Sequence, residues 1–120
     1  MNMTVGDIFD KWSILRMKVR LLGEDSDEYA RYSQEVTKLF KIEFLPDVAD
    51  LIEANSKIWI LESDIRNGKN MHLKEVGQRA LQIRDINQMR IEAKNTINAI
   101  FGDYQEIKIN HASERSNLEN

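Results

Sequence analysis

The chain has 120 residues, enough for one domain with one hydrophobic core. Hydrophobic residues make up 42% and charged residues 31%, as in folded, soluble proteins, and the net charge of -3 lacks the basic excess that non-specific nucleic-acid binding needs. There is no cysteine, which excludes disulfides and thiolate metal sites. The apolar runs are too short to span a bilayer, and no signal peptide is evident at the start. We therefore expect a cytoplasmic protein without nucleic-acid or membrane partners.

The first predicted helix runs from about residue 4 to residue 22. Thr4 is a suitable N-cap, and Asp7, three residues later, completes a start that resembles a capping box. Apolar residues at three-four spacing form one stripe, and a second stripe lies on nearly the opposite side. A helix that is apolar on two sides lies either at the centre of its domain or in a subunit interface. The two stripes are Val5, Ile8, Trp12, Leu15, Val19 and Leu22, and Ile14, Met17 and Leu21.

The second predicted helix follows a turn at Gly23, with Asp25 or Ser26 as its N-cap. It must end before Pro46, because the proline ring removes a backbone donor and disfavours helix at the preceding residue. One face carries Tyr29, Tyr32, Val36, Leu39 and Phe40.

The third predicted helix covers about residues 47–66 and stops at the pair Asn67-Gly68, and the fourth covers about residues 73–101. These elements predict an all-α, up-and-down bundle of about four helices in residues 1–103. Residues 104–120 are expected to be a polar tail, ordered only where it finds a partner, with a short extended piece possible within residues 104–109.

Several polar residues fall where the last two helices should be apolar, since each residue advances about 100° around a helix. Arg90 lies near the centre of the apolar arc of the fourth helix, with Asn87 and Lys94 beside it. Glu62 has the same place on the third helix, and Arg66 is close to it. The polar residues within the two arcs are Asn55, Glu62, Arg66, Asn87, Arg90, Lys94 and Asn98.

A lone buried charge costs several kcal/mol, so these groups should be paired. We predict a Glu62–Arg90 pair with two hydrogen bonds. This pairing leaves the cations Arg66 and Lys94 without a partner, and Lys11 and Lys18 border the first helix's stripe. Asp10 can neutralise one of these cations, so a pocket here should carry a positive surplus and prefer an anion. Two interpretations stay open: a structural ion pair that fixes helix register, and a small-anion site for a phosphate or carboxylate. A rotated helix would instead return the charges to solvent. The candidate ligand-binding residues are Lys11, Glu62, Arg66, Asn87, Arg90 and Lys94.

Three segments carry a resemblance to a known family. The start, T-V-G-D-I-F-D-K-W-S-I-L-R-M-K, is similar to V-G-E-L-x-D-K-x-T-I-L-x-x-K, and I-W-I-L-E-S-D-I-R is similar to L-W-x-I-E-D-x-I-R. The third segment, N-Q-M-R-I-E-A-K-N-T-I-N, resembles N-D-x-R-x-x-L-K-R-x-I-N. These blocks are typical of a bacterial "domain of unknown function" family of small helical proteins, and the resemblance spans about residues 4–108. It implies a helical fold and no particular activity. Its motif residues include Glu62, Arg66, Asn87, Arg90 and Lys94, whereas Ser63 and Gln88 stand where relatives have acids.

Enzymatic alternatives find few candidate residues. A metal-dependent nucleotide pyrophosphatase of the all-helical type needs facing pairs of acids. Asp64 points about 160° away from Glu62, and Asp85 lies off the apolar arc of its helix. His72 and His111 lack ligand spacing, and no phosphate-binding glycine loop is present. We therefore expect no metal or cofactor, and the residues leave open whether the protein is an enzyme.

The sequence thus favours an oligomeric interaction module with a buried polar cluster. The two-sided first helix, and tyrosines of the second helix that we expect to be exposed, suggest a homodimer with two-fold symmetry. The alternative is a binding protein or enzyme that takes a small anionic ligand, of the phosphate or nucleotide type, through the Lys/Arg/Glu cluster.

Overall fold

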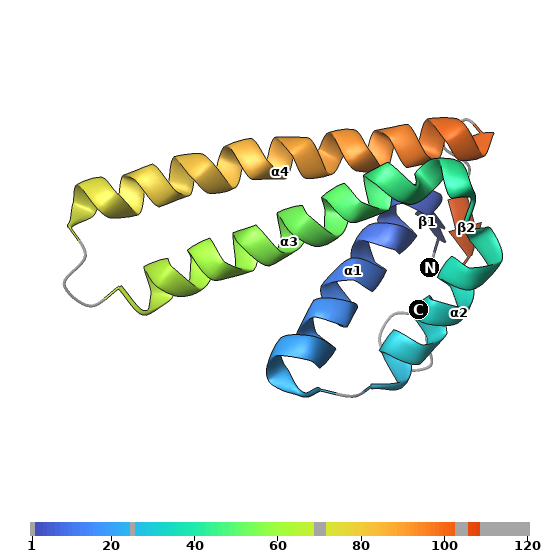
Figure 1. Cartoon of the computed structure of the whole chain (residues 1–120), viewed down its shortest axis with the longest axis horizontal. Coiled ribbons are helices and arrows are strands. Elements are labelled where there is room, and N and C mark those ends of the chain that lie inside the picture. Colours follow the sequence, from blue (N-terminus) through green and yellow to red (C-terminus); the bar gives the residue numbers. More distant parts are fainter. Residues whose placement is uncertain (1, 25, 69–71, 103–105, 109–120) are drawn as a thin grey trace.

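The computed structural model describes residues 2–24, 26–68, 72–102 and 106–108. It confirms the predicted all-α bundle of four helices, to which a two-stranded sheet is added. The elements in chain order are β1 (Asn2–Thr4), α1 (Val5–Leu22), α2 (Asp27–Leu39), the 3-10 turn η1 (Ile42–Phe44), α3 (Leu45–Arg66), α4 (Leu73–Gly102) and β2 (Glu106–Lys108). Figure 1 shows α3 and α4 side by side as a long hairpin, with α1 and α2 against one end of it.

The helix starts follow the predicted capping residues. The Thr4 hydroxyl accepts a hydrogen bond from the Asp7 N–H at 3.1 Å, and the Ser26 hydroxyl accepts one from the Tyr29 N–H at 3.1 Å. Each satisfies one of the backbone donors that a helix start leaves without a partner. Helix α1 ends at Gly23, whose φ of 68° is the left-handed conformation that glycine adopts without strain. The alternative cap, Asp25, lies outside the described residues.

The break between α2 and α3 also agrees with the sequence. Helix α2 ends at Leu39, and η1 leads directly into α3. Pro46 lies in the first turn of α3, where a helix needs no N–H donor and where the fixed φ of proline suits the helix. Helix α3 begins two residues earlier than predicted and ends, as predicted, at Arg66, with Asn67 as its C-cap.

The core lies on both sides of α1. One cluster joins α1 to η1, α3 and α4, and in it the rings of Phe9 and Phe44 meet edge to face at 5.4 Å. A second cluster joins Ile8 and Leu15 of α1 to Tyr32 of α2. Helix α1 is thus central in the domain, which was one of the two roles predicted for a helix with two apolar sides.

The expectation that the tyrosines of α2 are exposed was wrong. Tyr32 is only 1% exposed, and its hydroxyl donates to the Met3 sulfur at 3.2 Å. Tyr29 is half-buried against the same core cluster. The reason is that α2 turns its aromatic face onto α1 and β1, so these side chains give no support to a dimer interface on α2.

Strands β1 and β2 pair antiparallel, with Asn2 opposite Lys108 and Thr4 opposite Glu106. The short extended piece predicted within residues 104–109 is therefore present at residues 106–108. Its partner β1 was not predicted, because three residues are too few to show an alternating pattern. Residues 104–105 and 109–120 of the predicted tail lie outside the described residues, as does residue 103 before it.

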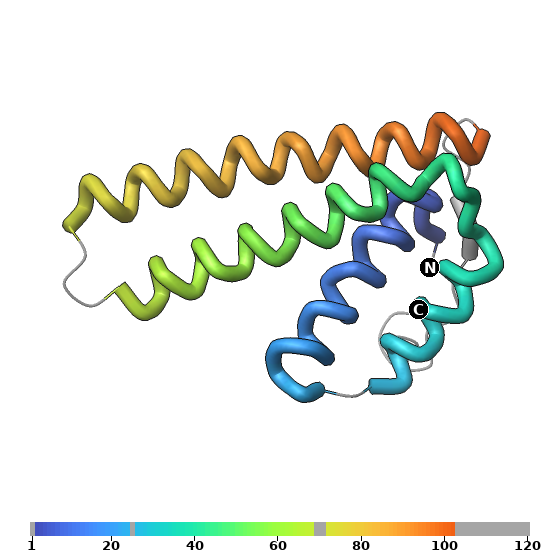
Figure 2. The backbone as a smooth tube through the Cα atoms, in the orientation of Figure 1, coloured from blue at the N-terminus to red at the C-terminus, as the bar shows by residue number. Residues whose placement is uncertain are grey.

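The hairpin of α3 and α4 extends well beyond α1 and α2, as the backbone trace in Figure 2 makes clear. We call residues 57–66 of α3 and 73–89 of α4 the arm, and the remainder of the described structure the core end. The longest dimension of the molecule, 45 Å, reflects this projection. Large apolar side chains are exposed along the arm: Ile60, Leu73, Leu81 and Met89.

Candidate functional site: the Asp10–Arg90 network and the arm groove

The polar cluster predicted in the core is centred on Asp10 of α1 and Arg90 of α4. The Arg90 Nε donates to Asp10 Oδ1 at 2.8 Å, and Nη2 donates to Oδ2 at 2.6 Å. The Asp10 side chain is buried, and that of Arg90 is 26% exposed. Two parallel hydrogen bonds between opposite charges make this a strong, orientation-specific pair. Hydrogen bonding to Asp10 outweighs the opposing effect of burial, so the pKa of Arg90 is raised above its ordinary value.

The prediction that Arg90 points inward is confirmed, but the predicted Glu62–Arg90 pair was wrong. Glu62 is exposed and makes no ion pair with Arg90. Its charge is only close enough to contribute, as the smallest cause, to the raised pKa of Arg90. The physical reason is that α1 packs against both α3 and α4, which brings Asp10 to the guanidinium first.

A signal in the sequence could have identified this face of α1. Gly6, Asp10, Ser13 and Met17 recur at helical spacing, and all four are buried. They form a third stripe, which overlaps the second apolar stripe at Met17 and is otherwise made of small or polar residues. Small residues allow close approach between helices, so the stripe marks the side where α1 meets α3 and α4.

Two further side chains complete the hydrogen bonding around Asp10. Asn55 of α3 donates from Nδ2 to Asp10 Oδ1 at 2.9 Å and to the Ser13 hydroxyl at 2.7 Å. The Ser13 hydroxyl donates to the Asp10 backbone carbonyl at 2.7 Å. On the other side, Arg90 donates from Nη1 to Asn87 Oδ1 at 2.9 Å. The buried carboxylate of Asp10 on α1 is therefore held by donors from two other helices, Asn55 of α3 and Arg90 of α4, as a buried charge requires.

The first turn of α1 lies directly against the backbone of α4. The Gly6 N–H donates to Asn98 Oδ1 at 2.7 Å, and the Lys94 ammonium lies 3.2 Å from Asp7 Oδ1. A Cβ atom at Gly6 would lie 2.4 Å from the Lys94 carbonyl oxygen. Only glycine fits this contact without a shift of the backbone.

The six residues predicted to bind a ligand do not gather in one place. Arg90 and Asn87 belong to the network, and Lys94 is beside it, paired with Asp7. The remaining three are at the periphery. Lys11 pairs with Glu28 of α2 at 3.7 Å, Arg66 donates to the Ser63 hydroxyl from an exposed position, and Glu62 is exposed.

The local charge differs from the predicted positive surplus. Arg90, Lys94 and Lys11 each have a carboxylate partner, in Asp10, Asp7 and Glu28. Asp10, Ser13 and Asn55 were absent from the predicted set of ligand-binding residues. Asn55 had been placed within the apolar arc, whereas Asp10 had been considered only as a partial neutraliser.

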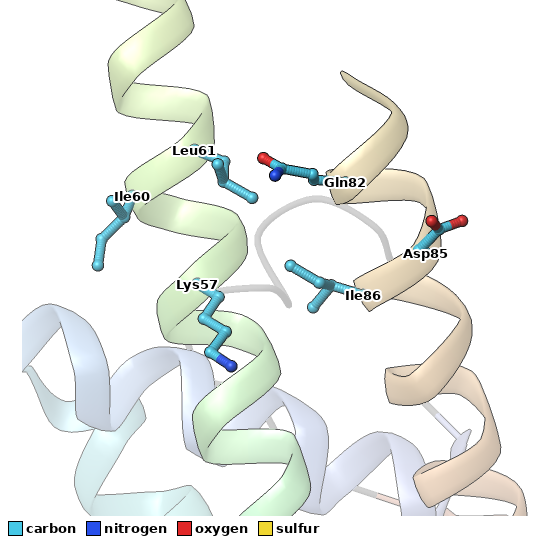
Figure 3. Close-up of a pocket in the computed structure, with 6 residues that line it drawn as sticks. All are labelled: Lys57, Ile60, Leu61, Gln82, Asp85 and Ile86. Carbon is cyan, nitrogen blue, oxygen red and sulfur yellow. The ribbon is translucent and has the colours of Figure 1, made fainter. Parts of the chain in front are cut away.

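The arm carries a separate groove of about 390 Å³ between α3 and α4, on the side opposite the network. Figure 3 shows Leu61 of α3 and Ile86 of α4 pointing toward one another across it, with Gln82 beside them. Lys57 and Asp85 lie on different helices of the same groove. The floor is thus apolar, with one cation and one anion at its edges.

Neither region resembles a metal centre: in residues 2–24, 26–68, 72–102 and 106–108, no three acidic or histidine side chains are placed to hold a metal ion together. No helix within those ranges is both long enough and apolar enough to cross a membrane. No family model, no curated protein and no solved structure matches the chain. The family resemblance of the three sequence blocks therefore remains a prediction.

Proposed function

We propose that the protein is a helical interaction module that forms a homodimer through its arm. The observation that carries the proposal is the exposed apolar surface of the arm, where Ile60 and Leu81 are 52% and 53% exposed. Exposed apolar residues scattered singly are ordinary on protein surfaces. Here they accompany an apolar groove on a projecting hairpin, which is typical of an interaction site.

A hairpin of two helices buries only the sides that the helices turn toward each other. At the core end α1 covers the hairpin, but nothing in the described structure covers the groove of the arm. Packing two arms face to face produces four helices around one apolar centre, which is a stable architecture for helices of this length.

The charges at the edges of the groove favour a second copy of this chain as the occupant. A two-fold axis parallel to the arm places α3 of one copy against α4 of the other. Lys57 then faces Asp85 of the partner subunit, and the contact occurs twice because the interface is self-complementary. Within one copy Lys57 pairs with Glu53 and Asp85 with Arg84, both in exposed positions. Exposed pairs contribute little, so they can be exchanged for contacts across the interface.

In this account the Asp10–Arg90 network has a structural role. It holds α1 at a fixed position against α3 and α4, and so fixes the base from which the arm projects. Breaking one partner of such a buried pair is strongly destabilising, whereas its net contribution when intact is small. This supports the register interpretation of the polar cluster, with Asp10 in the place predicted for Glu62.

The alternative small-anion site receives less support from the geometry. Its cations Lys11, Lys94 and Arg90 already have carboxylate partners. The pyrophosphatase alternative receives less still, because Asp64 is paired with Arg79 at 3.5 Å and the residues described contain no group of three acidic or histidine side chains that could hold a metal ion.

The test is the mass in solution by sedimentation equilibrium. We expect the wild-type protein at about 100 μM, a concentration where micromolar dimers are populated, to have twice the chain mass of 14.0 kDa. Ile60→Glu should give a monomer, because the new carboxylate would lie in the apolar contact and near Asp85 of the partner subunit. Ile42→Glu is the matched control: Ile42 is exposed but lies on η1, so the dimer should persist.

An exchange of the two groove charges tests whether the partner is a second copy of this chain. Lys57→Asp and Asp85→Lys should each weaken the dimer, and the two together should restore it. A monomeric wild-type protein, or a dimer that Ile60→Glu leaves intact, would contradict the proposal.

A further inference from the structure

A second pocket, of about 270 Å³, lies between α1 and α3 on the opposite side of the hairpin from the arm groove. Figure 1 shows that α1 leans away from α3 beyond the end that they share. The divergence opens a space beside the Asp10–Arg90 network. Its apolar walls are formed by Ile14 and Met17 of α1 and by Ile58 and Trp59 of α3.

Asn55 provides a hydrogen-bond acceptor at this pocket. Its residue is 5% exposed, and both of its N–H groups are used, by Asp10 Oδ1 and by the Ser13 hydroxyl. The orientation of the amide is fixed because a carboxylate can only accept, so the NH₂ group must face Asp10. The Asn55 Oδ1 is then left with no donor from any residue that the structure describes, and the atom is accessible to solvent at the pocket. It can therefore accept a hydrogen bond from a ligand N–H.

Arg90 provides donors at the same place. Three of its five N–H groups are used, by Asp10 and Asn87, and the residue lines the pocket. Two N–H groups therefore remain for a ligand. Because Asp10 already neutralises the guanidinium, Arg90 offers hydrogen bonds rather than a net positive charge.

The free charges of the pocket are one cation and one anion. Lys18 belongs to α1 and Glu62 to α3, and both are exposed. Neither has an ion-pair partner among residues 2–24, 26–68, 72–102 and 106–108. A pocket with this balance favours neither a phosphate nor a simple cation. It matches a small molecule that carries both charges.

We propose that the pocket binds an α-amino acid with an aliphatic or aromatic side chain. The carboxylate of the ligand is placed toward Lys18 and the free N–H groups of Arg90. The ammonium is placed toward Glu62 and the Asn55 Oδ1, and the side chain lies against Trp59. The small volume suits such a ligand, since pockets for larger organic ligands start at about 300 Å³. This site is independent of the arm groove, because Asn55 and Glu62 lie on the opposite face of α3 from Lys57.

The test is isothermal titration of the wild-type protein with L-leucine and L-phenylalanine. Three probes separate the features of the ligand. The first, 4-methylpentanoate, has no ammonium; the second, 3-methylbutylamine, has no carboxylate; and the third, inorganic phosphate, keeps only a negative charge. We expect an amino acid to bind with a Kd below about 1 mM and each of the three probes to bind at least about tenfold more weakly.

Two variants locate the site without touching the buried network. Glu62→Gln should weaken binding of the amino acid by about tenfold and leave the weak binding of 4-methylpentanoate unchanged. Lys18→Met should instead weaken binding of both the amino acid and 4-methylpentanoate. Lys57→Met, on the other face of α3, is the control and should change neither. Absence of binding by any amino acid at about 10 mM, equal binding of phosphate, or affinities insensitive to both variants would overturn the proposal, whatever the oligomeric state.

Discussion

The two ends of the α3–α4 hairpin use the same helices in opposite ways. At the core end Ile97 of α4 is fully buried and Arg90 is held by two hydrogen bonds to Asp10. In the arm, Leu81 of the same helix is half exposed, and the Arg84 side chain is 72% exposed beside its neighbour Asp85. The difference lies in whether α1 covers the hairpin, and not in the helices themselves.

This contrast separates what stabilises the chain from what is available to a partner. Apolar side chains buried in the core end contribute to folding in proportion to the area removed from water. Exposed apolar side chains in the arm contribute only when another surface covers them. The core end therefore should determine the free energy of unfolding of one copy, and the arm should determine association.

The largest expected effect is the loss of the charge pair in the core end. Arg90→Met should lower the free energy of unfolding by about 3–5 kcal/mol, because Asp10 is left buried without its charged partner. Arg84→Met removes an arginine charge from the arm and should change the free energy of unfolding by less than about 0.5 kcal/mol. Urea unfolding followed by circular dichroism measures both.

The cause can be separated from simple loss of packing. Asp10→Leu combined with Arg90→Met should recover part of the loss, since no charge is then left unpaired. If Arg90→Met costs less than about 1 kcal/mol, the network does not hold the core end together.

The next effect in size concerns two glycines, one at each end. Gly6→Ala should destabilise by about 1–3 kcal/mol, because the new Cβ would press on the Lys94 carbonyl oxygen. Gly77→Ala, in the open arm, should stabilise by about 0.5–1 kcal/mol, because nothing lies within 4 Å of its Cβ position and alanine is the better helix former. Thermal unfolding of the two variants should therefore move in opposite directions; a shift of the same sign would show that α1 and α4 are less close at Gly6 than described.

The smallest expected effect is the loss of an ion pair that joins two helices, one such pair at each end of the hairpin. Lys94→Met should cost about 1 kcal/mol, because the pair with Asp7 is partly buried and joins α1 to α4. Arg79→Met breaks the more exposed pair with Asp64 in the arm and should cost less than about 0.5 kcal/mol. Chemical denaturation at low and at high salt measures the loss of unfolding free energy in each variant. The difference between the two losses should become smaller at high salt, because salt screens both pairs. Equal losses in the two variants at low salt would show that the ion pair of the core end is no stronger than that of the arm.

Much of the fold could be predicted because its signals are local. Thr4 and Ser26 are capping residues, Pro46 separates two helices, and Asn67 ends α3. The inward position of Arg90 also follows from the spacing of one helix. Its partner does not, because the choice between Asp10 and Glu62 depends on how three helices are rotated relative to one another.

The exposure of the arm could not be predicted from the sequence either. Ile86, which lines the arm groove, lies on the same side of α4 as the buried Ile97. The pattern alone therefore cannot distinguish a surface covered by the same chain from one left uncovered. The pocket beside Asn55 was missed for a related reason. It depends on the angle at which α1 leaves α3, and no residue of α1 indicates that angle.

The most direct test of the difference between the ends is hydrogen exchange as a function of protein concentration, measured by mass spectrometry over seconds to minutes. In that interval local opening dominates over global unfolding. Between about 1 μM and about 200 μM, the backbone amides of residues 57–66 and 73–89 should become more protected, while those of α1 remain unchanged, and Ile60→Glu should abolish the gain. Exchange in the arm that does not depend on concentration, or a gain of protection shared equally by α1, would contradict an arm that is open in one copy and covered by a second.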